Sequence, residues 1–382
     1  MRSVALALVA LAVVAGVSGC GPMRGATPSA KEALGSDRDD LTPASLALAA
    51  ERTAEAIERG QGAETFDLGG RRYPRSEMAR SARRVAEIAR SSKNAGELTA
   101  NLARECRAFA VPEPAKVTAY YEPLLAARLR PDTRFRYPIY RLPSAEQLAT
   151  VLRRLGRKPT RADIDSGEAL RGLGLELAWL DDPVARFFLH VQGSGRLVLE
   201  DGTETRVGYA GNNGLAYRSV GAVMLERGHL VSGKASASAM RAWLAEHPDL
   251  RDALLEENGR YIFFRDTGRE GPIGALGATL VAGRSIATDD RYVPRGSLAF
   301  LRSTQPVMGG DGRIVGSKPL SRFVFAQDVG AAIQGAARVD VFWGSGEEAG
   351  VEAGGMNQAG ELALLLCGKV RGVPLFKLPT AK

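Results

Sequence analysis

The sequence predicts an α+β protein, mostly β, with N-terminal helices followed by at least two β-rich units. Helical periodicity dominates up to residue 108, whereas segments rich in β-branched and aromatic residues, separated by Gly or Asp-Gly, begin at residue 117. The region after residue 260 consists of short apolar runs interrupted by Gly and Pro. This last pattern is typical of a compact β-barrel and differs from that of a parallel α/β sheet.

The N-terminus has the pattern of a secretory signal. An apolar run at residues 4–17 follows Arg2 and is too short to span a membrane stably. The next residues, VSGC at 17–20, resemble the lipobox of bacterial lipoproteins, which implies that Cys20 becomes the lipidated first residue. Because each buried CH₂ of a lipid gains about 0.8 kcal/mol, a multiply acylated cysteine would hold an otherwise soluble domain at a membrane. An ordinary signal with a chance cysteine is the alternative.

We therefore expect a signal peptide at 1–19, a lipid anchor and tether at 20–40, and a mature protein that faces the periplasm. Gly21 stands where an aspartate often signals inner-membrane retention, which favours the outer membrane. With Cys20 lipidated, Cys106 and Cys367 are left, and a disulfide and two reduced buried cysteines are both open.

Composition and charge limit the metals, cofactors and macromolecules that the protein is expected to bind. No CxxC, HExxH or Cys/His cluster has metal-ligand spacing, so we expect no metal and no cofactor. The net charge is +8, but nucleic acid is a poor partner outside the cytoplasm, and no Lys/Arg tract has interleaved aromatic residues. An anionic cell-wall polymer or a membrane surface fits that compartment better.

The elements follow in order along the chain. Helices are predicted at 41–59, where Thr42 precedes Pro43, and at 75–91, 94–108, 215–227, 236–247 and 249–257. Strands are predicted at 117–125, 187–192, 196–199, 205–210 and 261–264, with a hairpin turn at Asp201-Gly202. We expect N-terminal helices and the first part of a barrel domain at 41–130, an inserted β-domain at 131–260, and the rest of the barrel at 261–375.

Several catalytic plans find no support in the sequence. It contains no Gly-x-Ser-x-Gly and no Ser-x-x-Lys, and neither remaining cysteine has an activating local context. Residues 344–349, GSGEEA, fit a loose dinucleotide fingerprint, but Glu347 and Glu348 would face phosphate at a helix start. A nucleotide site therefore requires that residues 344–346 form a strand-to-helix turn in a parallel sheet.

Two aspartates interrupt apolar strands near the C-terminus: Asp328 in AQDVG and Asp340 in RVDVFWG. A carboxylate in such a strand is costly unless it is paired, is hydrogen-bonded, or has a raised pKa that keeps it protonated. A raised pKa is what a general acid needs near neutral pH. The structural alternative is an aspartate that fixes a turn through hydrogen bonds.

Four segments in fixed order carry a family resemblance: TAYYEP at 118–123, FLHVQGSG at 188–195, GYAGNNG at 208–214, and the region from Gly271. From about residue 116 to 366 the chain resembles the membrane-bound lytic transglycosylase A family. The resemblance implies a double-psi β-barrel and, inserted in it, a second smaller β-domain across a substrate groove. The C-terminal part resembles a domain named for three aspartates, which here are Asp289, Asp328 and Asp340.

The third aspartate is the family's catalytic acid, so the resemblance assigns that role to Asp340. The implied reaction is non-hydrolytic cleavage of the β-1,4 bond between N-acetylmuramic acid and N-acetylglucosamine in peptidoglycan, which makes the enzyme a lyase. Asp340 would protonate the glycosidic oxygen, and the C6 hydroxyl would close on C1 to give a 1,6-anhydro end. We expect Asp328, on the neighbouring strand, to support catalysis, and Asp289 to be structural.

Residues of the groove follow from the same motifs. We expect substrate contacts from Thr118, Tyr120, Tyr121, Gln192, Ser194, Asn212, Asn213 and Gln334. Core packing is the alternative for the two tyrosines and for Trp343, whereas Gly193 and Gly195 let a ligand approach Gln192. Gln334 replaces the family's usual lysine, which puts substrate affinity in doubt.

We expect a monomer bound to peptidoglycan and held at the membrane through Cys20; membership of a cell-wall synthesis complex is left open. The principal rival function is a non-catalytic, expansin-like peptidoglycan-binding lipoprotein, because double-psi barrels also serve proteins that cleave no bond.

Overall fold

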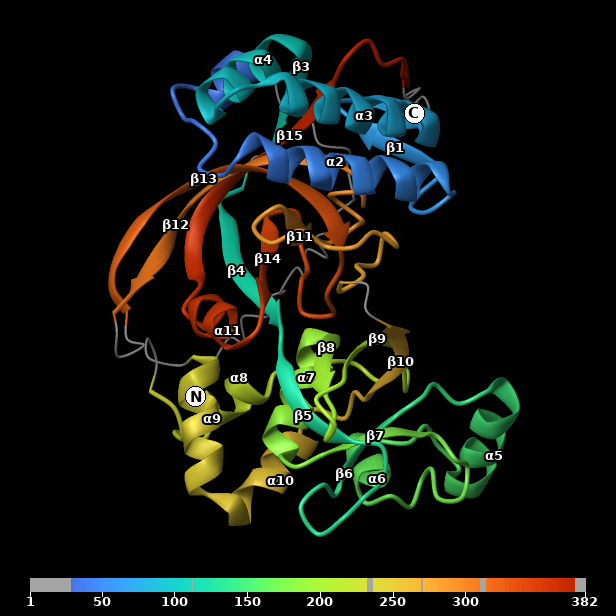
Figure 1. Ribbon diagram of the computed structural model, residues 1–382. Coiled ribbons are helices and arrows are strands. Elements are labelled where there is room, and N and C mark those ends of the chain that lie inside the picture. Colours follow the sequence, from blue (N-terminus) through green and yellow to red (C-terminus); the bar gives the residue numbers. More distant parts are fainter. Residues whose placement is uncertain (1–28, 112, 232–235, 269–270, 310–313, 375–382) are drawn as a thin grey trace, which may run out of the picture.

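The computed structural model describes residues 29–111, 113–231, 236–268, 271–309 and 314–374. Figure 1 shows a β-barrel, with helices packed over one end and a second β-rich unit beyond the other. The predicted signal peptide and Cys20 lie outside the described residues. Within the described part of the chain, no helix is long and apolar enough to cross a membrane.

Six strands close the barrel in the order β12, β13, β11, β14, β4, β15 and back to β12. They are β4 (Ala115–Glu122), β11 (Ser285–Ala287), β12 (Leu298–Met308), β13 (Ile314–Asp328), β14 (Arg338–Ser345) and β15 (Asn357–Cys367). The pairs β4–β14 and β11–β13 are parallel, and the other four are antiparallel. Alternate residues such as Val117, Val339 and Val341 are fully buried in the core. The closed barrel confirms the fold class that the sequence predicts.

The N-terminal helices cover the barrel through a second apolar cluster. This region contains α1 (Ala30–Leu34), α2 (Pro43–Glu58), β1 (Thr65–Leu68), β2 (Arg71–Pro74), α3 (Arg75–Ser91), α4 (Ala95–Glu105) and β3 (Cys106–Ala110), and the C-terminal β16 (Val373–Pro374) pairs with β2. Pro43 occupies the first turn of α2, as predicted. The predicted helix at 94–108 ends early, at Glu105, because Cys106 begins a strand that pairs with β15.

The second β-rich unit is built from the chain between β4 and β11. Its sheet has the order β10, β9, β8, β5, β7, β6. The strands are β5 (Leu124–Arg128), β6 (Tyr137–Tyr140), β7 (Glu176–Leu180), β8 (Ser194–Val198), β9 (Glu204–Asn212) and β10 (Ile262–Gly268). The helices are α5 (Ala145–Leu155), α6 (Arg161–Asp165), α7 (Pro183–Gln192), α8 (Val220–Glu226), α9 (Ala237–Glu246) and α10 (Pro248–Glu256). β5 follows β4 after Pro123, so one extended segment runs from the barrel into this unit (Figure 1).

The predicted strand at 187–192 is wrong, because these residues form the second half of helix α7. Asp182 caps the helix by accepting a hydrogen bond from the amide of Val184 at 2.7 Å, and Pro183 occupies the first turn. Gly193 ends the helix with a φ of 78°. Phe187 and Phe188 are buried against α8, α9 and α10, so tertiary packing and the caps outweigh the local β-propensity.

The dinucleotide alternative fails on topology. Residues 344–346 do lead from β14 into a helix, α11 (Glu347–Gly354). However, the next strand, β15, is antiparallel to β4, β12 and β3, so the segment is not the parallel strand-helix-strand unit that a nucleotide needs.

The structure closes the open question of the two cysteines. Cys106 and Cys367 are joined by a disulfide that links β3 to the end of β15, where the two residues are register partners.

Candidate active site

Strand β4 organises the site, because alternate side chains of one strand project from the same face. Thr118 and Tyr120 share such a face, opposite the core residues Val117 and Ala119. In the parallel pair β4–β14, Thr118 is the register partner of Asp340, and Tyr120 is the partner of Phe342. The register alone therefore brings TAYYEP to the strand that carries the third aspartate.

The carboxyl group of Asp340 is half-buried, and the hydroxyl of Thr118 donates a hydrogen bond to its Oδ1. Burial raises the pKa of Asp340 to about 6, whereas the bond from Thr118 and the charge of Arg338 lower the pKa by less, and Asp328 adds a small rise. A carboxyl group with this pKa is partly protonated near neutral pH, so it can donate a proton and afterwards accept one.

Asp328 is held by three donors. Its Oδ1 accepts hydrogen bonds from the backbone amides of Ala275 and Val329, each at 2.9 Å, and its Oδ2 accepts one from the hydroxyl of Tyr120 at 2.8 Å. Burial raises the pKa of Asp328 and also the pKa of Tyr120, whose phenol stays protonated and donates.

Asp328 and Asp340 do not lie on neighbouring strands, which corrects the prediction. Strand β11 runs between theirs, and Ala287 on it pairs with Asp328 on one side and Asp340 on the other. The two carboxyl groups therefore flank a single small residue. The charge of one contributes to the pKa of the other, although burial is the larger cause.

Asp289 has a structural role, as expected. Its Oδ2 accepts a hydrogen bond from the amide of Gly335 at 2.8 Å, and both its oxygens bind the guanidinium of Arg291. Hydrogen bonding to Arg291 holds the pKa of Asp289 at about 2. This carboxylate fastens the loop between β13 and β14 to the end of β11.

The second unit reaches the barrel beside β4. Oε1 of Gln192, the last residue of α7, accepts a hydrogen bond from the amide of Tyr121 at 3.0 Å. Arg241 of α9 donates to the hydroxyl of Tyr121 at 3.3 Å, and the ring of Tyr121 packs against Gly350 of α11. Ser194 begins β8 directly after Gly193. The structure therefore brings Gln192 to the strand of Thr118.

Asn213 does not fit the substrate role that its motif implies. It is buried, and its Nδ2 donates to the carbonyls of Pro159 and Gly259, both at 2.8 Å. Its Oδ1 accepts from the amide of Tyr261 at 2.9 Å. These bonds use both amide protons, so Asn213 holds the second unit together from within.

Asn212, Gln334 and Trp343 lie in different surroundings. Asn212 ends β9, where its Nδ2 donates to the hydroxyl of Tyr209 at 2.6 Å. Gln334 is exposed in the loop after Asp328 and donates to the carbonyl of Ala331 at 3.1 Å. The indole of Trp343 packs against the barrel core and donates to Glu352 of α11 at 2.6 Å, so packing explains this residue.

Sequence reasoning missed a buried acid at the end of β4. Glu122 is fully buried, and its carboxylate accepts hydrogen bonds from Arg206 of β9 and from Ser345 of β14. The sequence signal that could have identified Glu122 is the acidic residue directly after the two tyrosines of TAYYEP.

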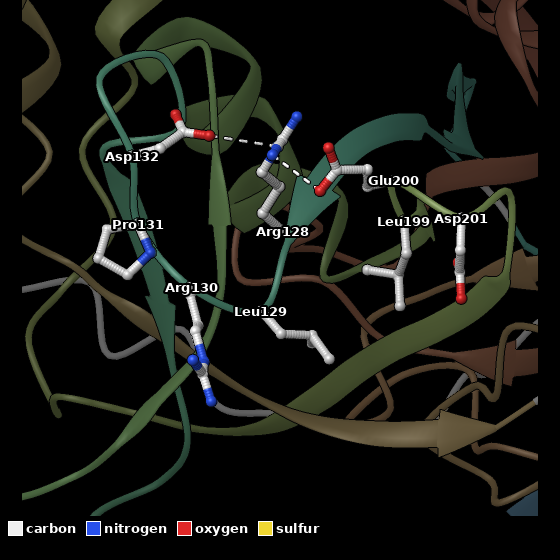
Figure 2. A pocket seen from close by; sticks show the side chains of 8 residues that line it. All are labelled: Arg128, Leu129, Arg130, Pro131, Asp132, Leu199, Glu200 and Asp201. Atoms are coloured by element: carbon white, nitrogen blue, oxygen red, sulfur yellow. Dashed lines mark hydrogen bonds and ion pairs between the residues drawn. The ribbon is translucent and has the colours of Figure 1, made fainter.

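A separate hollow of about 480 Å³ lies at the end of β5 away from the barrel (Figure 2). Arg128 crosses it to bind Asp132 at 3.3 Å and Glu200 at 2.8 Å. It is lined by residues 128–132 and 199–201, and no predicted site residue is among them.

Two family models match parts of the chain. The family model of the MltA specific insert domain matches residues 116–265, and that of the 3D domain matches residues 284–366. The chain is 36% identical over 250 residues to membrane-bound lytic murein transglycosylase A of Escherichia coli (strain K12). That alignment covers 65% of this chain and 64% of the relative, so the match spans a little less than two thirds of the relative's length.

Solved structures match over more of the chain. A membrane-bound lytic murein transglycosylase from Agrobacterium tumefaciens superposes with a TM-score of 0.70 at 32% identity, covering 89% of this chain and 95% of that one. E. coli MltA with bound chitohexaose superposes with a TM-score of 0.68 at 26% identity, covering 87% and 92%. The chain therefore belongs to the membrane-bound lytic murein transglycosylase A family.

Proposed function

We propose that this chain is a peptidoglycan lytic transglycosylase with Asp340 as its acid and base. The observation that carries the proposal is the environment of Asp340: a half-buried carboxyl group in an apolar strand, hydrogen-bonded to Thr118, with its pKa raised to about 6. The family's name and the amino-sugar oligomer bound by the E. coli relative support peptidoglycan glycan strands as the substrate.

The reaction needs only one such group. Protonated Asp340 donates its proton to the glycosidic oxygen, and the bond from that oxygen to C1 of N-acetylmuramic acid breaks as C1 gains oxocarbenium character. The C6 hydroxyl of the same sugar then bonds to C1 and returns its proton to Asp340. The carboxyl group ends as it began, no water is consumed, and the products are a 1,6-anhydromuramoyl end and a free N-acetylglucosamine end.

We assign Asp328 a supporting role. Its three hydrogen bonds fix it across Ala287 from Asp340, where its charge contributes to the raised pKa of the acid. For contact with the sugars we propose Thr118, Tyr120, Tyr121, Gln192, Ser194, Asn212 and Gln334. Asn213 is left out because its amide is already bonded within the second unit.

The location is also a proposal. Residues 17–20 match a lipobox, and a lipid on Cys20 would hold the enzyme at the outer membrane, facing the periplasm, where its substrate lies.

The test is digestion of purified peptidoglycan by residues 21–382 and by the Asp340→Asn variant, with mass spectrometry of the released fragments. We expect 1,6-anhydromuramoyl ends from the wild-type chain and none from the variant, because an amide of the same shape cannot deliver the proton. Reducing ends from the wild-type chain would mean a hydrolase. Binding without release would favour the non-catalytic, expansin-like function.

A further inference from the structure

Three alternate side chains on one face of β4 each bind a different part of the site. Thr118 binds Asp340 of β14, and Tyr120 binds Asp328 of β13. The third, Glu122, binds Arg206 of β9, which belongs to the second unit. One strand therefore contacts the candidate acid, its supporting aspartate and the second unit.

The carboxylate of Glu122 is satisfied on both sides. Nε of Arg206 lies 3.1 Å from its Oε1 and 3.3 Å from its Oε2, and the hydroxyl of Ser345 donates to Oε2 at 2.7 Å. The backbone carbonyl of Glu122 also accepts a hydrogen bond from the amide of Gly346 at 2.9 Å. Ser345 and Gly346 follow Asp340 closely along the chain, so Glu122 ties the end of the strand that carries the acid to the second unit.

Burial makes this arrangement specific. The side chain of Glu122 is 0% exposed and that of Arg206 is 19% exposed, so neither charge is well solvated. Burying an ion pair costs desolvation energy and adds little net stability, but breaking one partner is strongly unfavourable. Because the attraction offsets the desolvation cost only in good geometry, the pair favours a narrow range of separations between β4 and β9.

Arg206 transmits this constraint into the second unit. On β9 it lies two residues from Gly208, which pairs with Ser194 of β8, and it also pairs with Gly268 at the end of β10. A contact that fixes Arg206 therefore fixes the part of the sheet that carries Ser194. The bond from Tyr121 to Gln192 reinforces the same junction.

We propose that Glu122 is a positioning residue that aligns the second unit with Asp340, so that a glycan held by both sides presents its scissile bond to the acid. The proposal rests on the proposed function and deepens it. Glu122 takes no part in proton transfer, because its oxygens are occupied by Arg206 and Ser345. Its loss misaligns bound substrate, and a displacement of about 1 Å can cost about a hundredfold in rate.

The experiment compares Glu122→Gln, Ser345→Ala and the wild-type chain, all as residues 21–382, on soluble uncrosslinked glycan strands. We expect Glu122→Gln to lower kcat by about ten- to a hundredfold and to change KM by less than about threefold. The pKa near 6 that the pH dependence of kcat/KM reports for Asp340 should be unchanged. Ser345→Ala leaves the ion pair between Glu122 and Arg206 intact, so this variant contains no unpaired buried charge. Its kcat should lie between those of Glu122→Gln and the wild-type chain.

The matched control is Asp40→Asn, which breaks the ion pair with Arg322 on the N-terminal side of the barrel, where N to O is 2.7 Å. This variant should lose thermal stability and keep wild-type kcat per folded molecule. Wild-type kcat in folded Glu122→Gln and in Ser345→Ala would overturn the proposal, as would loss of the kinetic pKa near 6 in Glu122→Gln. Product analysis of the wild-type chain in the same assay tests the proposed function separately: reducing ends there would contradict the lyase without altering the kcat comparison.

Discussion

Thr118 and Asp340 are register partners on the parallel strands β4 and β14, and the hydroxyl of Thr118 donates a hydrogen bond to the carboxyl group of Asp340. The acid is thus fixed by a residue 222 positions away in the chain. This bond favours the ionised carboxylate and opposes burial, which favours the protonated form. The balance sets the pKa of Asp340 at about 6, where it can act first as acid and then as base.

The first prediction concerns the pH dependence of catalysis. Because the first step needs protonated Asp340, kcat/KM should fall as the pH rises through about 6. Thr118→Val removes a bond that lowers this pKa, so the fall should move to higher pH, whereas Thr118→Ser should keep the wild-type profile. Rates measured from pH 4 to pH 9 check this, and an unmoved profile in Thr118→Val would contradict the assigned role of the hydroxyl.

A second prediction links the same pKa to stability. The pKa of Asp340 is higher in the folded chain, about 6, than the ordinary value of about 3.9, so folding favours the protonated form. The stabilising contribution is complete below pH 4 and is lost as the pH rises through 6. Asp340→Asn has no such group to ionise, so its unfolding free energy does not show this loss. The difference in unfolding free energy between the variant and the wild type should therefore shift by roughly 1–3 kcal/mol in favour of the variant from pH 4 to pH 8. Urea unfolding at both pH values measures it; a difference independent of pH would refute the raised pKa.

A third prediction distinguishes the effects of Asp328→Asn and Asp328→Ala. Asparagine keeps an oxygen for the amides of Ala275 and Val329, so Asp328→Asn should slow turnover less than Asp340→Asn does. Alanine leaves the buried hydroxyl of Tyr120 without an acceptor, which should cost about 1–3 kcal/mol of stability. A double-mutant cycle with Tyr120→Phe isolates this bond: the cost of Asp328→Ala should shrink in that background, and an unchanged cost would argue against the bond.

The disulfide gives a fourth prediction. Cys106 and Cys367 close a loop of 261 residues, so replacing both by serine should cost about 2–5 kcal/mol of stability. Thr118 pairs with Asn357 at the opposite end of β15 from Cys367, so the bridge lies far from Asp340. We therefore expect a lower unfolding temperature with unchanged kcat at low temperature. A large loss of kcat in the folded variant would mean that the bridge shapes the site.

Local signals predicted part of this structure well. The helix predicted at 75–91 matches α3 because its apolar residues recur at helical spacing and its arginines occupy the other face. The alternation of Gly and short apolar runs likewise indicated a barrel. Helix α7 was missed because FFLHV has high β-propensity, although Asp182, Pro183 and Gly193 mark its ends in the sequence.

Non-local pairing explains what the sequence did not predict. Asp328 and Asp340 appeared to be on neighbouring strands because a short connection usually joins adjacent strands, yet β11, from much earlier in the chain, lies between them. The role of Glu122 depends on Arg206, which is 84 residues away. Asn213 is polar and lies in a family motif, so the sequence favoured a contact with substrate. Only the structure shows that its amide is already hydrogen-bonded inside the second unit.

The most direct test of the central claim is digestion of purified peptidoglycan in water labelled with heavy oxygen, followed by mass spectrometry of the new glycan ends. If Asp340 transfers the proton and the C6 hydroxyl attacks C1, the new muramoyl ends carry no label and lack the mass of one water. Labelled reducing ends would show that water attacks C1, and would contradict the lytic transglycosylase mechanism.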